Sequence, residues 1–363
     1  MSGQKVALVS LGCAKNLVDS EVMLARLGEA GWSVTPEAAQ ADAVVINTCA
    51  FIDPAKAEST EVILEHALAK QPGQQLIVAG CLSQRFGSEL LSLIPEIDGI
   101  VGTGAYNGIE SVLDEARQGL RPVRLEFEAE PEHDFLPRLV TTPRATAYLK
   151  IAEGCDHPCT FCIIPKLRGA FRSRTAESVL KEARALAASG TKELILIAQD
   201  TSMWGRDLGW RRGGLAALLE QLSDVEGIEW IRLLYLYPAT VDDELIDAIA
   251  RLPKVCKYMD MPLQHAHPEV LRRMLRPSNG ERYLEIIEEF RARVPGMTMR
   301  STFIVGFPGE TEEHVDYLEA WIARAELDRV GFFPYSREDG TPGADLDAQV
   351  PEKTKRRRLL RLR

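Results

Sequence analysis

Two kinds of short segment alternate along nearly the whole chain, and this alternation constrains the fold most. In the first half, aliphatic and β-branched runs are separated by stretches with apolar residues at helical spacing, such as residues 16–31. Because parallel strands need long connections, usually helices, a β-α-β-α series predicts a parallel sheet covered by helices. The strands expected in this half span residues 5–11, 41–48, 75–80 and, with a weaker pattern, 98–102.

The second half repeats the alternation with more units. Six strand candidates separated by about five helical stretches predict an open or partial α/β barrel of TIM-like type, with its active face at the carboxyl ends of the strands. The first half instead predicts a Rossmann-like or flavodoxin-like parallel sheet. The barrel strands are expected at residues 147–153, 193–199, 230–237, 257–263, 298–307 and 329–335.

A segment with neither a strand-like nor a helix-like apolar pattern separates the two halves. Residues 120–145 are rich in Pro and Glu, as expected of an interdomain connection. We therefore expect an α/β protein with an N-terminal domain of residues 1–135 and a barrel domain of residues 136–345. The basic residues 346–363 are expected to form a solvated helix face, and the alternatives are a connector into a further domain or an RNA contact.

Charge and cysteine usage restrict the classes of function. Lys and Arg number 43 against 53 Asp and Glu, and the formal charge of −10 argues against a broad nucleic-acid-binding face. No apolar run approaches the roughly 18 residues of a membrane span, and the N-terminus lacks signal-peptide features. We expect a cytoplasmic protein with no membrane partner, whose seven cysteines are reduced and free for metal binding or catalysis.

Three cysteines with the spacing C-x-x-x-C-x-x-C follow the first strand of the second half. Cys155, Cys159 and Cys162 lie in EGCDHPCTFCIIP, and thiolates this close in sequence can converge on a metal centre. Structural zinc normally takes four ligands, whereas an iron-sulfur cluster with three protein ligands keeps one iron open for a small molecule. His157 could complete a zinc site, but its position two residues from each flanking Cys fits zinc spacing poorly.

A second cysteine set is spread over the first half. Cys13, Cys49 and Cys81 each lie at or near the carboxyl end of a predicted strand, in SLGC, INTC and AGC. Because parallel strands present these ends at one edge of the sheet, the three thiols can converge despite their separation in sequence. The alternative is three small buried residues. Cys256 belongs to neither set.

Five ordered motifs resemble a known enzyme family. They are SLGCAKNLVDSE, AEGCDHPCTFCIIPKLRG, AQDTSMWG, MPLQHA and STFIVGFPGETEE. The three-cysteine loop, with Phe161 before its third Cys, resembles the radical S-adenosylmethionine (SAM) enzymes. The three upstream cysteines resemble the methylthiotransferase branch of that family, and the resemblance runs nearly end to end.

The resemblance implies two 4Fe-4S clusters and SAM as cofactors. The loop cysteines would hold the catalytic cluster, whose open iron binds SAM, and the upstream cysteines would hold an auxiliary cluster for sulfur delivery. One SAM would serve as the radical source and another as the methyl donor. A low-potential electron donor and a sulfide donor are implied as partners.

The motifs also resemble one substrate class more than another. CAKNLVD, AQDTS and PLQH favour the branch that adds a methylthio group to the β-carbon of an aspartate in small-subunit ribosomal protein S-twelve. The tRNA adenosine methylthiotransferases share both cysteine sets, so the metals do not discriminate between the two. A non-enzymatic iron-sulfur electron carrier is the alternative from another class, although a carrier does not need a barrel.

Three further residues are expected to contact SAM. Gln199, Asp200 and Gly306 end predicted barrel strands, where the wider superfamily places groups near the methionine part of SAM; ordinary turn residues are the alternative.

Family members continue into a small C-terminal TRAM domain. This chain stops where that domain would begin, so we expect weakened docking to the ribosomal protein.

Overall fold

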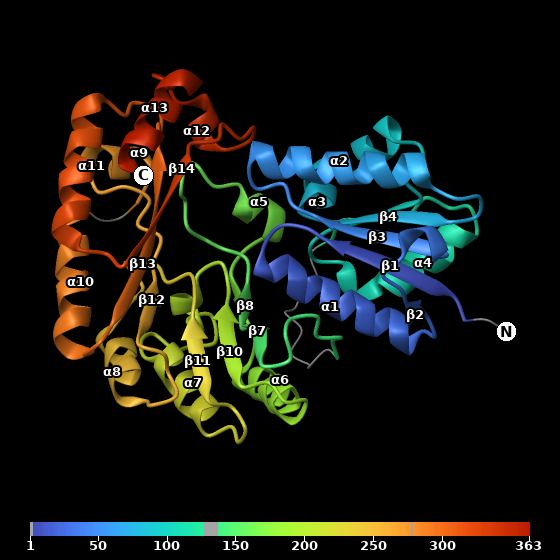
Figure 1. The fold of residues 1–363 in the computed structure, drawn as a ribbon, viewed down its shortest axis with the longest axis horizontal. Coiled ribbons are helices and arrows are strands. Elements are labelled where there is room, and N and C mark those ends of the chain that lie inside the picture. Colours follow the sequence, from blue (N-terminus) through green and yellow to red (C-terminus); the bar gives the residue numbers. More distant parts are fainter. Residues whose placement is uncertain (1–2, 127–136, 277–278) are drawn as a thin grey trace. The chain divides into compact units, whose positions relative to one another are not determined.

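The computed structural model describes residues 3–126, 137–276 and 279–363. The chain forms two compact units, one of residues 1–143 with 164–170 and the other of residues 144–163 with 171–363 (Figure 1). Residues 127–136 of the expected connection lie outside the described residues. Near the start of that expected connection, the short strand β6 (Val123–Arg124) pairs in parallel with its neighbour in the sheet of the first unit.

The first unit contains one parallel sheet, as the alternating pattern predicts. Its order is β2-β1-β3-β4-β5-β6, and every neighbouring pair is parallel. In this order β1, β3 and β4 are neighbours, and each of these three strands is followed by a cysteine. The strands are β1 (Lys5–Ser10), β2 (Ser33–Val34), β3 (Ala43–Thr48), β4 (Gln75–Gly80), β5 (Gly99–Val101) and β6 (Val123–Arg124).

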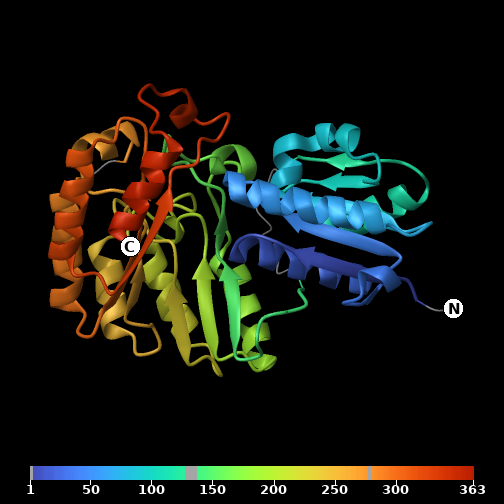
Figure 2. The same ribbon diagram turned by 45° about the horizontal axis from the view of Figure 1, so that its top comes forward.

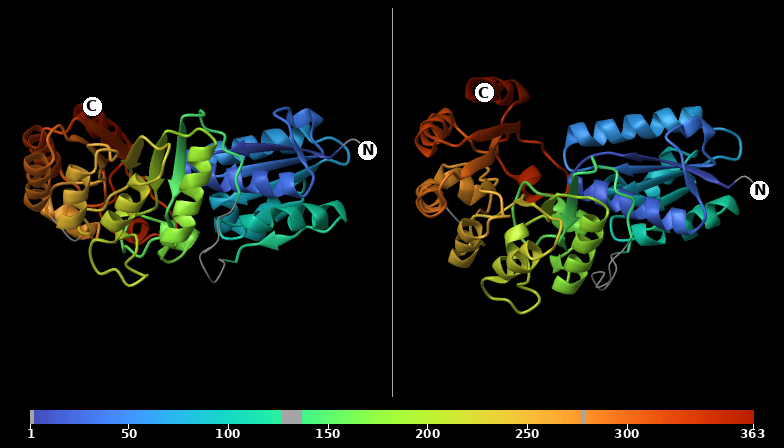
Figure 3. Two further views of the ribbon diagram at one scale, coloured as in Figure 1. Left: turned by 90° about the horizontal axis from the view of Figure 1, so that it is seen from below. Right: turned by 60° about the horizontal axis from the view of Figure 1, so that its bottom comes forward.

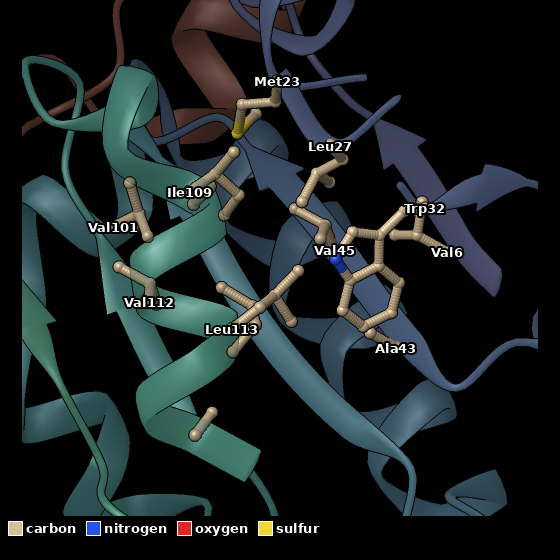
Figure 4. Close-up of a cluster of buried hydrophobic side chains, with 13 residues drawn as sticks. Val6, Met23, Leu27, Trp32, Ala43, Val45, Val101, Ile109, Val112 and Leu113 are labelled. Atoms are coloured by element: carbon tan, nitrogen blue, oxygen red, sulfur yellow. The ribbon is translucent and has the colours of Figure 1, made fainter. Parts of the chain in front are cut away.

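Helices cover both faces of this sheet because its central strands are apolar on both sides. The right-hand view of Figure 3 shows α2 on one side of the sheet and α1 on the other. Met23 and Leu27 of α1 join Ile109 and Leu113 of α4 in a buried core over the strands (Figure 4). The helices are α1 (Ala14–Glu29), α2 (Asp53–Ala69), α3 (Cys81–Leu93), α4 (Ile109–Arg117) and α5 (Ile164–Arg168), with short 3-10 turns at Ala38–Gln40 and Tyr106–Gly108.

The second unit carries six parallel strands in chain order, as expected of a partial barrel. Figure 2 shows the strands of two three-stranded sheets, β11-β10-β7 and β12-β13-β14. An isolated bridge between Ile231 and Val255 links the two sheets. A short antiparallel pair, β8 (Ala152–Glu153) and β9 (Arg172–Ser173), was not expected from the sequence. The six strands are β7 (Thr146–Lys150), β10 (Glu193–Ile197), β11 (Trp230–Leu233), β12 (Tyr258–Asp260), β13 (Thr298–Val305) and β14 (Arg329–Pro334).

Side-chain caps fix where several helices of the second unit begin. Thr175, Asp242, Asn279 and Thr311 each accept a hydrogen bond from a backbone N–H of the first helical turn. Helices long and apolar enough to cross a membrane are absent from the described ranges. The helices are α6 (Ala176–Ala188), α7 (Gly214–Ser223), α8 (Asp243–Arg251), α9 (Pro268–Arg273), α10 (Gly280–Arg293), α11 (Glu312–Ala325), α12 (Pro342–Asp345) and α13 (Glu352–Leu362), with a 3-10 turn at Thr201–Met203.

The basic C-terminal helix α13 packs against the rest of its unit. Lys355 and Arg358 are buried, and Arg358 forms an ion pair of 2.9 Å with the buried carboxylate of Glu310. Arg358 also pairs with Glu312, and Arg361 pairs with Asp316 of α11. The predicted solvated basic face is therefore wrong for this side of the helix, because the acidic start of α11 neutralises it. The role of residues 346–363 as a connector stays a prediction.

Candidate metal centres

The loop cysteines lie in a tight turn between β8 and α5. Gly154, which precedes Cys155, has a φ of +81°, a conformation that glycine adopts without a steric penalty. The N–H of Cys162 donates to the carbonyl of Cys159 at 3.1 Å. Cys159 is buried, and the other two thiols are partly exposed. The turn gathers all three thiols within one short segment.

Backbone contacts fix this loop within the second unit. Both the N–H and the hydroxyl of Thr160 donate to carbonyls at the end of α9, those of Met274 at 3.1 Å and Arg273 at 2.9 Å. The carbonyl of Thr160 accepts from the N–H of Gly343 at 2.7 Å. Phe161 packs against an apolar cluster that contains Phe307. The loop is therefore held in place by hydrogen bonds and apolar packing.

A stack of polar side chains lies beside the loop cysteines. The Nε2 of His157 lies 2.7 Å from a carboxylate oxygen of Asp200, and its ring stacks on Tyr237 with centroids 3.7 Å apart. The guanidinium of Arg276 also lies over the ring of Tyr237, 4.1 Å from its centroid. Arg276 reaches the sulfur of Cys159 at 3.8 Å. The stack therefore links Asp200 to a cysteine sulfur.

Arg276 brings a buried positive charge to the loop. Its other terminal nitrogen donates to the carbonyl of Pro262 at 2.6 Å. No carboxylate pairs with it among the residues that the structure describes. A buried cation beside a sulfur stabilises the thiolate, which is the form that binds metal. Burial raises the pKa of the Cys155 thiol to about 11, and the nearby negative charges of Asp200 and Cys159 contribute to this rise.

Two of the three predicted SAM-binding residues contact the loop or its flank. Asp200 holds His157, and the side-chain N–H of Gln199 donates to Glu153 at 2.5 Å. The side-chain oxygen of Gln199 is buried and has no hydrogen-bond partner within the described ranges. Gly306 lies at the end of β13, where its N–H donates to both carboxylate oxygens of Glu310 at 2.9 Å.

The upstream cysteines follow three neighbouring strands, β1, β3 and β4. Cys13 caps α1, and Cys81 is the first residue of α3, so two helix N-termini point toward the set, where their dipoles favour negative charge. Gly12, with φ of +89°, lies directly on Cys49: a Cβ there would stand 2.7 Å from the Cβ of Cys49. Burial raises the pKa of Cys49, and it raises that of Cys81 to about 12, with both other thiols contributing. The sheet order therefore brings the three thiols together.

A buried polar network surrounds the upstream set. Arg168 of α5 pairs with the carboxylate of Asp19 at 3.1 Å and donates to the side-chain oxygen of Asn16. That oxygen also lies 3.8 Å from the sulfur of Cys81, while the amide nitrogen of Asn16 donates to the carbonyl of Thr48 at 2.8 Å. Unlike Arg276, this second buried arginine has a carboxylate partner.

The spacing within each cysteine set does not fit a single ion. Among the described residues, three ligand atoms of His, Cys, Asp or Glu lie within 4.8 Å of one another only at His267, Glu269 and His314. Zinc needs such a gathering of its ligands, and His157 is instead held by Asp200. In a 4Fe-4S cluster each cysteine ligates a different iron, so the three sulfurs need not meet at one ion. The zinc alternative is therefore not supported.

The sequence did not single out Tyr237, Arg276, Arg168 or Asn16. Tyr237 and Arg276 lie outside the five motifs and carry no spacing signal. Arg168 and Asn16 lie within two of the quoted motifs, PKLRG and CAKN, and that was the one signal available. Only the tertiary structure shows that these two residues meet.

Comparison with known proteins decides the family. Residues 5–102 match the family described as uncharacterized protein family UPF0004, and residues 149–322 match the radical SAM superfamily. Over 99% of its length the chain is 48% identical to ribosomal protein uS12 methylthiotransferase RimO of Geobacter sulfurreducens, of which it covers 81%. The chain belongs to the RimO family of methylthiotransferases. A relative with the same name in Desulforudis audaxviator is 48% identical over 98% of this chain, and the match covers 79% of that relative.

Solved structures of other radical SAM enzymes share the fold. TsrM, a radical SAM methyltransferase from Kitasatospora setae with cobalamin and a 4Fe-4S cluster bound, has a TM-score of 0.68 at 17% identity, covering 94% of this chain and 77% of that one. The cobalamin-dependent enzyme OxsB has a TM-score of 0.61 at 13% identity, covering 99% and 61%. These likenesses confirm the predicted α/β fold. As a member of the radical SAM superfamily, the chain uses an iron-sulfur cluster and SAM.

Proposed function

We propose that this chain is a radical SAM methylthiotransferase that adds a methylthio group to the β-carbon of an aspartate in small-subunit ribosomal protein uS12. Relatives that carry this name are 48% identical over nearly the whole chain, and this identity is the observation that carries the proposal. We assign the methylthiotransferase domain to residues 1–135, the barrel domain to 136–345 and the connector to 346–363. The compact units of the structure have other bounds: residues 137–143 and 164–170 group with the first unit, and residues 346–363 group with the second. A tRNA adenosine substrate and an electron carrier are not favoured by these relatives.

The loop cysteines Cys155, Cys159 and Cys162 hold the catalytic 4Fe-4S cluster in this proposal. When bound, the cluster and SAM supply the one-electron chemistry that opens an unactivated C–H bond, which no side-chain base can do efficiently. The chain positions the cluster and excludes water. Arg276 places its positive charge 3.8 Å from the Cys159 sulfur, and the anchored Thr160 fixes the turn that carries the ligands.

Orphaned polar atoms beside the loop fit SAM as a ligand. The Gln199 side-chain oxygen and the Tyr237 hydroxyl are both buried without a hydrogen-bond partner in the described part of the chain. Such atoms are costly unless a ligand satisfies them. We assign Gln199 to the ammonium group of SAM, Asp200 to orienting His157 beside it, and Gly306 to the backbone turn next to the site.

The upstream cysteines Cys13, Cys49 and Cys81 hold the auxiliary 4Fe-4S cluster in this proposal. Raised thiol pKa values mean that Cys49 and Cys81 stay protonated until a metal replaces the proton, so loading releases protons. Two helix N-termini and Arg168 supply positive potential to the thiolates. The reaction further requires a sulfide donor and a low-potential electron donor, and reduced thiols fit the cytoplasm.

The test is an anaerobic assay with two substrates. The reconstituted chain is given SAM, a reductant and sulfide, together with either the ribosomal protein or tRNA, and both are analysed by mass spectrometry. We expect one methylthio group in place of a hydrogen on an aspartate of the protein. Modification of tRNA alone would refute the substrate, and absence of any SAM cleavage in an iron-loaded sample would refute the enzyme.

A further inference from the structure

Three ligating side chains meet at the starts of two helices of the second unit, apart from both cysteine sets. His267 and Glu269 lie at the start of α9, and His314 lies in the first turn of α11. One ligand atom from each lies within 4.8 Å of the others, and no other group of His, Cys, Asp or Glu in the described ranges meets this spacing. Neither the cysteine loop nor its polar stack uses these residues.

The three side chains lie against one another, with one of them at the surface. The two imidazole rings lie 4.1 Å apart between centroids, tilted by 35°, and the Nε2 of His314 lies 3.5 Å from a carboxylate oxygen of Glu269. Tyr317 packs edge-on against His267 with centroids 5.0 Å apart and limits its rotation. His314 is buried, His267 is half-buried and Glu269 is exposed, so the group opens to solvent on the carboxylate side.

Each histidine ring is already oriented by a backbone hydrogen bond. The Nδ1 of His267 accepts from the N–H of Glu269 at 3.2 Å, and the Nδ1 of His314 accepts from the N–H of Thr311 at 3.2 Å. The other ring nitrogen, Nε2, is therefore the atom left for a ligand. A cation at Nε2 displaces the ring proton to Nδ1, so each long cap hydrogen bond is exchanged for one nitrogen–metal bond.

We propose that His267, Glu269 and His314 form a binding site for a divalent transition-metal ion of the zinc class. Two imidazole nitrogens and one carboxylate suit zinc and its neighbours, whereas calcium and magnesium prefer oxygen ligands alone. Three protein ligands leave one position for water. The site is distinct from the iron-sulfur centres, whose ligands are thiolates.

The metal would tie together two elements that border the cysteine loop. It fixes the start of α9, a six-residue helix whose far end accepts the hydrogen bonds of Thr160 in the loop. It also fixes the start of α11, which follows the turn that contains Gly306 and Glu310. We therefore assign the ion a structural role that stiffens the support of the loop.

The experiment measures zinc on the intact, untagged protein. The chain is reconstituted anaerobically so that iron-sulfur clusters occupy the cysteines, dialysed against micromolar Zn²⁺ and analysed for both metals. We expect one zinc per chain with unchanged iron, and a melting temperature that rises when zinc is present.

Substitutions that keep the helix caps separate the metal role from the capping role. Asn is a good N-cap residue and Gln a good capping-box residue, so His267→Asn and His314→Gln retain backbone partners while losing the imidazole. We expect each to weaken zinc binding at least tenfold, to remove the zinc-dependent rise in melting temperature and to leave the metal-free melting temperature unchanged. His66→Gln in α2 is the matched control and should bind zinc as wild type does.

Two results would overturn the proposal. One is a wild-type protein that takes up no zinc while its iron is complete. The other is zinc retained with full affinity by both cap-preserving variants, because the ion would then be held elsewhere.

Discussion

The two cysteine sets show two ways to bring three thiols together. The loop set comes from one short segment, so its geometry is encoded in the spacing of its own residues. The upstream set comes from the ends of β1, β3 and β4, so it exists only when the sheet has formed. In both sets a glycine with positive φ precedes a cysteine: Gly12 before Cys13, Gly80 before Cys81 and Gly154 before Cys155.

The sets also differ in how a buried arginine is used. Arg168, near the upstream set, pairs with Asp19 in a network that joins α5 to α1, and its charge opposes the effect of burial on the pKa of Cys81. Arg276, near the loop set, has no carboxylate partner among the described residues, and its charge faces Cys159. Both arginines thus bring positive charge to a cysteine set, but only Arg168 also joins two helices through a buried ion pair.

The largest expected effects come from removing one ligand from each set. We expect Cys13→Ala and Cys155→Ala each to lose about half of the bound iron, because each set must deprotonate and hold its own cluster. Methylthiolation should be lost in both variants. Reductive cleavage of SAM should be lost in Cys155→Ala and kept in Cys13→Ala. Iron and sulfide quantification with detection of 5'-deoxyadenosine measures all three.

Equal loss of SAM cleavage in the two variants would contradict the division of roles between the sets. Cys256→Ala is the control: this thiol belongs to neither set, and its loss should leave iron and cleavage at wild-type levels.

The sequence predicted the parts of this picture that depend on local pattern. The longer strands of the parallel sheets, and the position of Cys13, Cys49 and Cys81 after three of them, follow from periodicity and from the geometry of parallel strands. The two-residue strands β2, β6, β8 and β9 were not predicted, because two residues are too few to show a period. Arg168 and Arg276 could not be found this way, because their partners lie far away in sequence: Asp19 is 149 residues from Arg168, and Cys159 is 117 residues from Arg276. The packing of α13 was missed for the same reason, since its acidic partners lie on α11 and in the turn before it, more than 40 residues away.

Replacing Arg168 tests the stabilising half of the comparison. Arg168→Met leaves the Asp19 carboxylate buried without this cation, a change that costs about 3–5 kcal/mol. We expect a large fall in the melting temperature of the metal-free chain. Arg276→Met leaves no buried carboxylate without its partner, so it should lower the free energy of unfolding clearly less than Arg168→Met does. Adding Asp19→Asn to Arg168→Met should restore part of the loss; no recovery would show that the pair is not the cause.

Replacing Gly80 tests the geometry of the upstream set. An alanine Cβ at Gly80 would lie 2.6 Å from the carbonyl oxygen of Thr48 and against the side chain of Asn47, in a backbone with φ of +89°. Strain and overpacking together should cost about 2–4 kcal/mol and reduce iron uptake by the upstream set. Gly73→Ala is the matched control, with φ of +82° and no atom within 4 Å of the new Cβ. It should cost about 1 kcal/mol and leave the iron content unchanged. Equal destabilisation of the two variants would mean that backbone conformation, not the close approach, decides the effect.

Removing the charge of Arg276 should have the smallest effect on folding and a specific effect on the loop cluster. A nearby positive charge favours the reduced, more negative cluster, so Arg276→Gln should lower its reduction potential. An attraction of about 1.4 kcal/mol corresponds to ~59 mV for a one-electron couple, and we expect a shift on this order. Arg276→Lys keeps the charge and should retain most of the wild-type potential. Redox titration followed by electron paramagnetic resonance, in a Cys13→Ala background that leaves only the loop cluster, measures the shift. An unchanged or raised potential in Arg276→Gln would mean that the guanidinium acts on the packing of Tyr237 rather than on the charge of the cluster.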